Sequence, residues 1–129
     1  VHLEHAEKNI DLRCNQHFVE KELCNQFEVL ATGDGWREER TGLHELEWIE
    51  TRRHRFTVPV IDENPYGVNV LNLVSGEKAI IDSPDGEFEP MTITYAQTVI
   101  IPAQIMRYRI TPMGDCERTP CMTVKAFIR

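Results

Sequence analysis

The chain has 129 residues, of which 41% are hydrophobic and 27% charged, a composition typical of one globular domain. With 21 acidic against 14 basic residues, the net charge is −7. This excess of acid argues against binding of a nucleic acid or an anionic membrane through basic side chains, and no apolar run approaches the roughly 20 residues of a membrane-spanning helix. Because the first residue is Val1, we expect a piece of a longer protein.

The first predicted element is a short helix over residues 1–13, in which Leu3, Ala6 and Ile10 recur at helical spacing. So short a helix is marginal alone, so we expect it to pack against another surface. The alternation over residues 17–23 predicts a strand, and residues 26–31 predict a second one. The sequence Thr-Gly-Asp-Gly at 32–35 then predicts a turn.

Residues 36–51 fit two structures. Leu43, Leu46 and Ile49 have the spacing of a helical turn, whereas Leu46 and Trp48 have that of a strand. Both interpretations stay open at this point.

The rest of the chain consists of short alternating segments separated by glycine and proline about every ten residues. Strands are predicted near residues 53–60, 68–74, 78–82, 91–95, 99–101, 106–111 and 122–128. Strand–helix–strand alternation is absent. The pattern therefore predicts a mainly β protein, an antiparallel sandwich or barrel preceded by a short N-terminal helix.

Four cysteines stand at positions 14, 24, 116 and 121, and no pair has the Cys-x-x-Cys spacing of structural zinc sites. A chain of this length can bury an adequate core without disulfides, so reduced thiols in a cytoplasmic protein are favoured. A disulfide between Cys116 and Cys121 stays open.

Other candidate sites have a simpler alternative. The basic run at residues 52–55, Arg-Arg-His-Arg, could bind a sugar phosphate, but arginines on a strand that meet nearby carboxylates are favoured. His2 and His5 share a helical face with Glu4, yet zinc needs further ligands. His44 lacks the second histidine of a metalloprotease helix, so we expect it on the surface.

Two longer segments resemble the cupin jelly roll. They are YGVNVLNLVSGEKAII, with a strand leading to Gly76, and TYAQTVIIPAQIMRYRI, with a strand ending at Pro102. The motifs HFVEKELC, LVSGEKAII, VIIPAQIMRYRI and VKAFIR together resemble the C-terminal cupin half of class I mannose-6-phosphate isomerases, whose linking helix the opening VHLEHAEKNID resembles. The resemblance implies a linking helix over residues 1–14 and a cupin-type jelly roll over residues 15–129, with an insertion near 33–52.

The resemblance also allows the usual cupin metal site to be tested by counting. The histidine expected five positions after Pro102 is Arg107, and the carboxylate expected seven positions before Gly76 is Asn69. The two remaining histidines should lie where residues 62–65 read Asp-Glu-Asn-Pro. Arginine stays protonated and cannot ligate a metal. We therefore expect neither a metal nor catalytic residues in this domain.

Taken together, the resemblance implies a non-catalytic C-terminal domain of a cytoplasmic, zinc-dependent enzyme that interconverts mannose-6-phosphate and fructose-6-phosphate. The upstream half of the parent chain would hold the zinc, bind the sugar phosphate and be the partner of this domain, and a homodimer is left open. The alternative is a stand-alone sugar-binding or assembly cupin without metal or catalysis.

Arg107 and Arg109 are the candidate ligand-binding residues. One alternation of the strand turns both into the barrel, as part of an anion pocket; the other buries Met106, Tyr108 and Ile110 and turns the arginines outward. A buried guanidinium without a partner is very costly, and surface placement is favoured.

Overall fold

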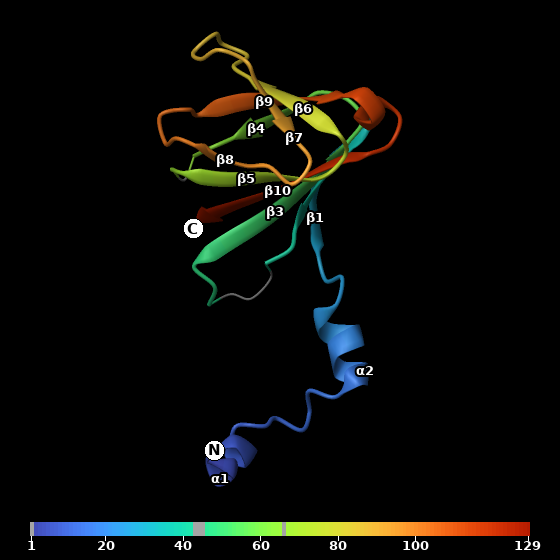
Figure 1. Ribbon diagram of the computed structural model, residues 1–129, viewed down its shortest axis with the longest axis vertical. Coiled ribbons are helices and arrows are strands. Elements are labelled where there is room, and N and C mark those ends of the chain that lie inside the picture. The colour runs from blue at the N-terminus through green and yellow to red at the C-terminus, as the bar shows by residue number, and fades with distance from the viewer. Residues whose placement is uncertain (1, 43–45, 66) are drawn as a thin grey trace.

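The computed structural model describes residues 2–42, 46–65 and 67–129, and over these ranges the chain forms two antiparallel sheets packed face to face (Figure 1). The larger sheet has the order β1-β2-β3-β10-β5-β8 and the smaller one β4-β9-β6-β7. The strands are β1 (Glu28–Gly33), β2 (Trp36–Arg40), β3 (Ile49–Phe56), β4 (Val60–Glu63), β5 (Asn69–Ser75), β6 (Lys78–Asp82), β7 (Met91–Thr94), β8 (Thr98–Ile101), β9 (Arg107–Met113) and β10 (Cys121–Ile128). The predicted mainly β antiparallel fold is confirmed.

The core lies between the sheets because alternate residues of each strand point inward. Leu71 and Leu73 on β5 face Tyr108 and Ile110 on β9, and all four are fully buried. The other buried hydrophobic residues of this cluster are Phe56, Val60, Ala79, Ile81, Ile93, Ile101, Cys116 and Cys121. This two-sided packing fixes the register of the central strands and so fixes which side chains reach the interior.

Two glycines have backbone conformations that the fold requires. Gly35 has a φ of +77° in the turn between β1 and β2, where residues 32–35 were predicted to turn. Gly76 has a φ of +98°, and a Cβ atom there would lie 2.1 Å from Cys116 Sγ. The second glycine therefore permits both a left-handed backbone and close contact with the buried cysteines.

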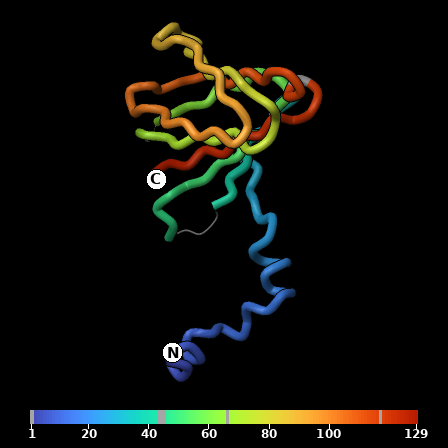
Figure 2. Tube along the Cα trace, viewed as in Figure 1, coloured from blue at the N-terminus to red at the C-terminus, as the bar shows by residue number. Residues whose placement is uncertain are grey.

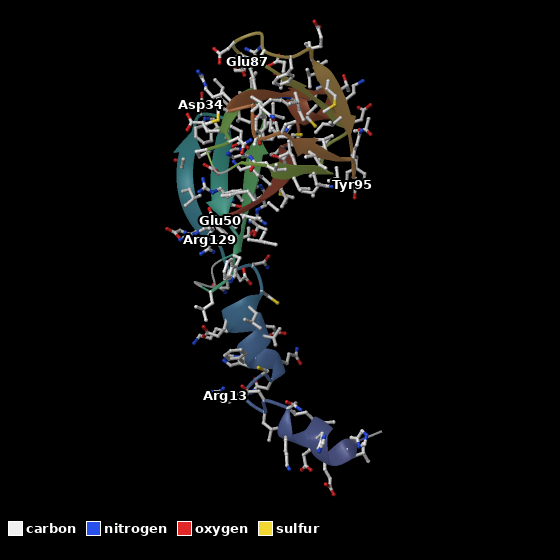
Figure 3. All side chains as sticks on the ribbon, turned by 90° about the vertical axis from the view of Figure 1, so that its left-hand side faces the viewer. Arg13, Asp34, Glu50, Glu87, Tyr95 and Arg129 are labelled. Atoms are coloured by element: carbon white, nitrogen blue, oxygen red, sulfur yellow. The ribbon has the colours of Figure 1, made fainter. Side chains whose placement is uncertain are left out.

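The N-terminal residues form short helices rather than one helix and a strand. α1 (Leu3–Lys8) is shorter than predicted and buries none of its residues, and Figures 2 and 3 show the segment around it and around Arg13 lying away from the barrel. The predicted strand over residues 17–23 is wrong: α2 (Gln16–Phe18) and the helical turn η1 (Val19–Leu23) occupy this place. Asn15 caps the helix by accepting from the Phe18 N–H at 3.0 Å, and the following Glu and Lys residues favour helix.

The ambiguous stretch after Gly35 begins and ends as strand, in β2 and in the first residues of β3. β2 pairs with residues 52–56 of β3 in the large sheet, and the exposed Leu46 and Trp48 belong to the connection between the two strands. Residues 43–45, which include Leu43 and His44 of the sequence interpretation, are outside the described residues. The region interpreted as an insertion thus supplies β2, an integral strand of the barrel wall.

All four cysteines are free thiols, two exposed on the N-terminal segment and two buried in the core. Among the described residues, no helix is long and apolar enough to cross a membrane.

Candidate functional site

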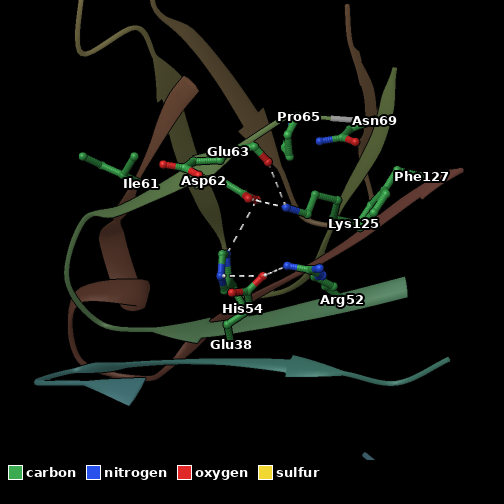
Figure 4. A pocket seen from close by; sticks show the side chains of 10 residues that line it. All are labelled: Glu38, Arg52, His54, Ile61, Asp62, Glu63, Pro65, Asn69, Lys125 and Phe127. Carbon is green, nitrogen blue, oxygen red and sulfur yellow. Dashed lines mark hydrogen bonds and ion pairs between the residues drawn. The ribbon is translucent and has the colours of Figure 1, made fainter. Parts of the chain in front are cut away.

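One end of the barrel opens into a pocket of about 430 Å³, hereafter the polar pocket (Figure 4). Its walls come from β2, β3, β4, β5 and β10, together with the loop that follows β4. It is lined by Glu38, Arg52, His54, Ile61, Asp62, Glu63, Pro65, Asn69, Lys125 and Phe127. Charged and amide side chains therefore converge on one cavity from five strands.

Strand alternation explains how these residues reach the interior. On β10 the buried residues are Cys121, Thr123, Lys125 and Phe127. Lys125 pairs across the sheet with Arg52 on β3, so both long cationic side chains stand on the inner face. The Phe127 ring lies 5.3 Å from the Arg52 guanidinium and 5.5 Å from the Lys125 ammonium, which gives each cation a favourable aromatic contact.

The centre of the polar pocket is an ion pair between Lys125 and Asp62. Their side chains are only 6% and 3% exposed, and Lys125 Nζ also donates to the Glu63 carbonyl oxygen at 3.4 Å. The other Asp62 oxygen accepts from the Tyr108 hydroxyl at 2.9 Å. Both charges are thus paired and hydrogen-bonded, the condition under which burial of an ion pair is tolerated.

Tyr108 is held in its neutral form by this surrounding. Burial raises the pKa of the phenol well above its ordinary value, and the Asp62 charge adds to the effect. The nearby Asn69 amide lowers the pKa of Tyr108, although its Nδ2 makes no hydrogen bond of normal distance and angle to a described residue. Tyr108 therefore serves as a donor to Asp62 and not as a proton acceptor.

His54 connects Asp62 to a second group of charges. Its Nδ1 lies 3.7 Å from Asp62 Oδ2, and its Nε2 lies 3.7 Å from Glu38 Oε1. Arg52 Nη1 donates to the same Glu38 oxygen at 3.2 Å, while Arg52 Nε donates to Glu50 at 2.5 Å. His54, more than Arg52, lowers the pKa of Glu38, which falls to about 2. Acidic side chains that alternate with Lys125, His54 and Arg52 thus form a continuous network along the pocket.

The chemistry of these groups does not fit a cupin metal ion. Asn69, at the counted position of a carboxylate ligand, does line the polar pocket, but an amide alone is a poor anchor. The Lys125 ammonium already neutralises Asp62 and would repel a divalent cation. Among the described residues, no group of three or more His, Cys, Asp or Glu side chains could hold a metal.

Arg107 and Arg109, the ligand-binding candidates from the sequence, lie outside this pocket. Tyr108 between them is buried, so both arginines point to the outer face of the small sheet. Arg109 donates to both oxygens of Asp82 at 2.9 and 2.8 Å, and Arg107 lies 3.8 Å from Asp85. This placement does not fit an anion pocket inside the barrel that contains the two arginines. It fits the alternative in which both arginines face outward.

The remaining sequence candidates lie on both faces of the barrel, on the N-terminal segment and just after β8. Of the basic run, Arg52 and His54 enter the polar pocket, while Arg53 on the outer face pairs with Glu39. The rings of His2, just before exposed α1, and His5, on α1, stack with centroids 5.7 Å apart, and the two residues belong to no metal-holding group of described residues. Pro102 follows β8, and its carbonyl oxygen accepts from Asn64 Nδ2 at 3.2 Å, which joins two loops of the barrel.

Sequence reasoning missed Lys125, Asp62 and Glu38 as site residues. The final strand has an alternating apolar face, Met122-Val124-Ala126-Ile128, which resembles a core face, yet the structure buries the opposite one. The available signal was the run Cys-Thr-Lys-Phe at positions 121, 123, 125 and 127. A lysine in that row must have a buried partner if the row faces inward.

No family profile and no curated protein matches the chain. Solved structures do. The mannose 6-phosphate isomerase of Bacillus subtilis matches with a TM-score of 0.61 and 11% identity, covering 80% of this chain and 28% of the isomerase. An RmlC-like cupin of Shewanella frigidimarina matches with a TM-score of 0.56 and 14% identity, covering 80% and 84%. A mutant of Bacillus subtilis oxalate decarboxylase matches with a TM-score of 0.61 and 13% identity, covering 76% and 27%. The chain spans little more than a quarter of the isomerase, and these likenesses show that it has the cupin fold.

Proposed function

We propose that this chain is a metal-free, non-catalytic cupin domain at the C-terminal end of a longer cytoplasmic protein related to class I mannose-6-phosphate isomerases. The upstream half of that protein would hold the zinc and convert the sugar phosphate, and the present domain would pack against it. The sequence motifs around Gly76 and Pro102 support this assignment, as does the structural likeness to an isomerase that the chain matches over 28% of its length.

The observation that carries the proposal is the buried Lys125–Asp62 pair. A catalytic cupin needs a metal or a free acid or base in its pocket, and here each buried ionisable group is engaged by another protein group. A divalent cation would have to displace the ammonium and pay for its desolvation at the same site. The pocket chemistry therefore supports a binding or structural role.

The test is an activity assay combined with a metal titration. The 129-residue chain is incubated with mannose-6-phosphate and zinc, and fructose-6-phosphate is measured by a coupled reaction. We expect no conversion above the buffer rate and no change in Tm when Zn²⁺ or Mn²⁺ is added, because a bound ion would raise Tm. Conversion by this chain, or a saturable rise in Tm with either metal that the change Asp62→Asn abolishes, would refute the proposal.

The second candidate is a stand-alone binding or assembly cupin. The share of the matched structures that the chain covers favours this candidate. The chain covers 84% and 81% of two cupin structures, which shows that a protein of about this size can consist largely of this fold. The sequence encoded upstream separates the two candidates. Glutamine, glutamate and histidine zinc ligands in an upstream cupin half support the isomerase-like parent, and their absence supports the stand-alone protein.

A further inference from the structure

The polar pocket contains one buried donor without an acceptor. Asn69 on β5 is 1% exposed, and its Nδ2 has no hydrogen-bond partner among the described residues. Figure 4 shows this nitrogen turned into the pocket, on the side of Pro65. An unsatisfied buried donor destabilises the fold, so a ligand group that accepts a hydrogen bond from it would gain binding energy.

The charges around Asn69 disfavour an anion as the source of that acceptor. Arg52 is already bonded to Glu38 and Glu50, and Lys125 to Asp62. A phosphate or carboxylate ligand would thus meet carboxylates whose cations are engaged, and it would be repelled.

A cationic ligand is also disfavoured, because it cannot accept a hydrogen bond and would meet like charges in the pocket. An ammonium ligand has only donors and offers nothing to the Asn69 N–H. It would also approach the Lys125 ammonium and the Arg52 guanidinium within the same 430 Å³ cavity. What remains is an uncharged molecule that can both accept from Asn69 and donate to a carboxylate.

Hydroxyl groups meet both requirements, since each donates one hydrogen bond and accepts others. Pro65 and Phe127, which both line the pocket, provide apolar surface for the carbon skeleton of such a molecule, and the pocket volume lies in the range of small-ligand sites. We propose that the polar pocket binds a neutral polyhydroxylated ligand, of the size of a hexose or a hexitol, and that Asn69 recognises it. The proposal rests on the metal-free pocket of the proposed function.

The experiment is a ligand-observed NMR titration of the 129-residue chain. The probes are D-mannose, D-glucose and D-mannitol, with mannose-6-phosphate and inorganic phosphate as anionic comparisons. We expect saturable binding of at least one neutral probe, weaker binding of mannose-6-phosphate than of mannose, and none of phosphate. Asn69→Leu should weaken binding of the neutral probe at least tenfold. Arg107→Gln, a change on the outer face of the small sheet, is the control and should leave binding unaltered.

Thermal unfolding separates recognition from a structural role. Asn69→Leu replaces an unsatisfied amide by an apolar group of similar size, so its Tm without ligand should equal or exceed that of the unaltered chain. Three results would overturn the proposal: no saturable binding of any neutral probe, tighter binding of the phosphorylated sugar, or unaltered binding by Asn69→Leu. None of these bears on metal affinity or turnover, so the proposed function stands or fails separately.

Discussion

The two halves of the inward face of β10 differ in chemistry although both are buried. At its start, Cys121 packs against Cys116 and the backbone of Gly76 in an apolar environment, and burial raises the pKa of the Cys121 thiol. Four residues later, Lys125 enters a network of charges. A barrel of this fold can evidently be closed by apolar packing, as the first half shows. The polarity of the second half is therefore an added feature, and we assign it to the pocket.

The largest loss of stability should come from removing the Lys125 ammonium, the cation at the centre of the polar pocket. Lys125→Met preserves the length and apolar stem of the side chain but leaves Asp62 as a buried charge without its ion-pair partner. Breaking a buried pair from one side costs about 3–5 kcal/mol, so we expect the free energy of unfolding in urea to fall by that amount.

The double variant Lys125→Met/Asp62→Asn is the control, because it removes both charges and leaves an amide for the Tyr108 hydroxyl. It should recover most of the lost stability. A single variant as stable as the unaltered chain would show that this end of the barrel does not depend on the pair.

A smaller loss of stability is expected at the apolar end of the barrel, where Cys116, Cys121 and Gly76 pack together. Gly76→Ala places a methyl group 2.1 Å from the present position of Cys116 Sγ and forces alanine into a positive φ. We expect a loss of about 2–3 kcal/mol in the free energy of unfolding. Gly67→Ala is the matched control: its φ is +105°, but a Cβ there would lie within 4 Å of no described residue beyond its chain neighbours, so only the backbone cost of about 1 kcal/mol should remain. Equal losses in the two variants would contradict the close packing described here.

The smallest expected effect concerns Glu38, whose contribution to the free energy of unfolding should depend on pH. Its pKa is about 2 in the folded chain against an ordinary 4.5, so its ion pairs stabilise the fold fully above pH 4.5 and lose this contribution as pH falls toward 2. Allowing for solvent screening, we expect Glu38→Gln to lose about 1 kcal/mol at pH 6 and almost nothing near pH 2. A stability difference that stays constant from pH 6 to pH 2.5 would contradict this assignment.

The sequence predicted the apolar end far better than the polar one. The strand near 78–82, the turn at 32–35 and the importance of Gly76 follow from local rules of alternation and backbone freedom, which the structure obeys. The polar pocket depends on which face of β10 is buried, and both faces contain hydrophobic residues. Only cross-strand register, which places Lys125 opposite Arg52, decides between them. The helical turn at 19–23 was missed because alternation in a short exposed segment also fits a helix.

The most direct test of the account is anomalous diffraction from crystals of the chain grown with Mn²⁺. We predict no anomalous peak in the polar pocket, with Lys125 Nζ within hydrogen-bonding distance of Asp62. A peak coordinated by Asp62 or His54, with the lysine ammonium displaced from the pocket, would contradict the claim that the Lys125–Asp62 ion pair leaves no site for a metal in the polar pocket.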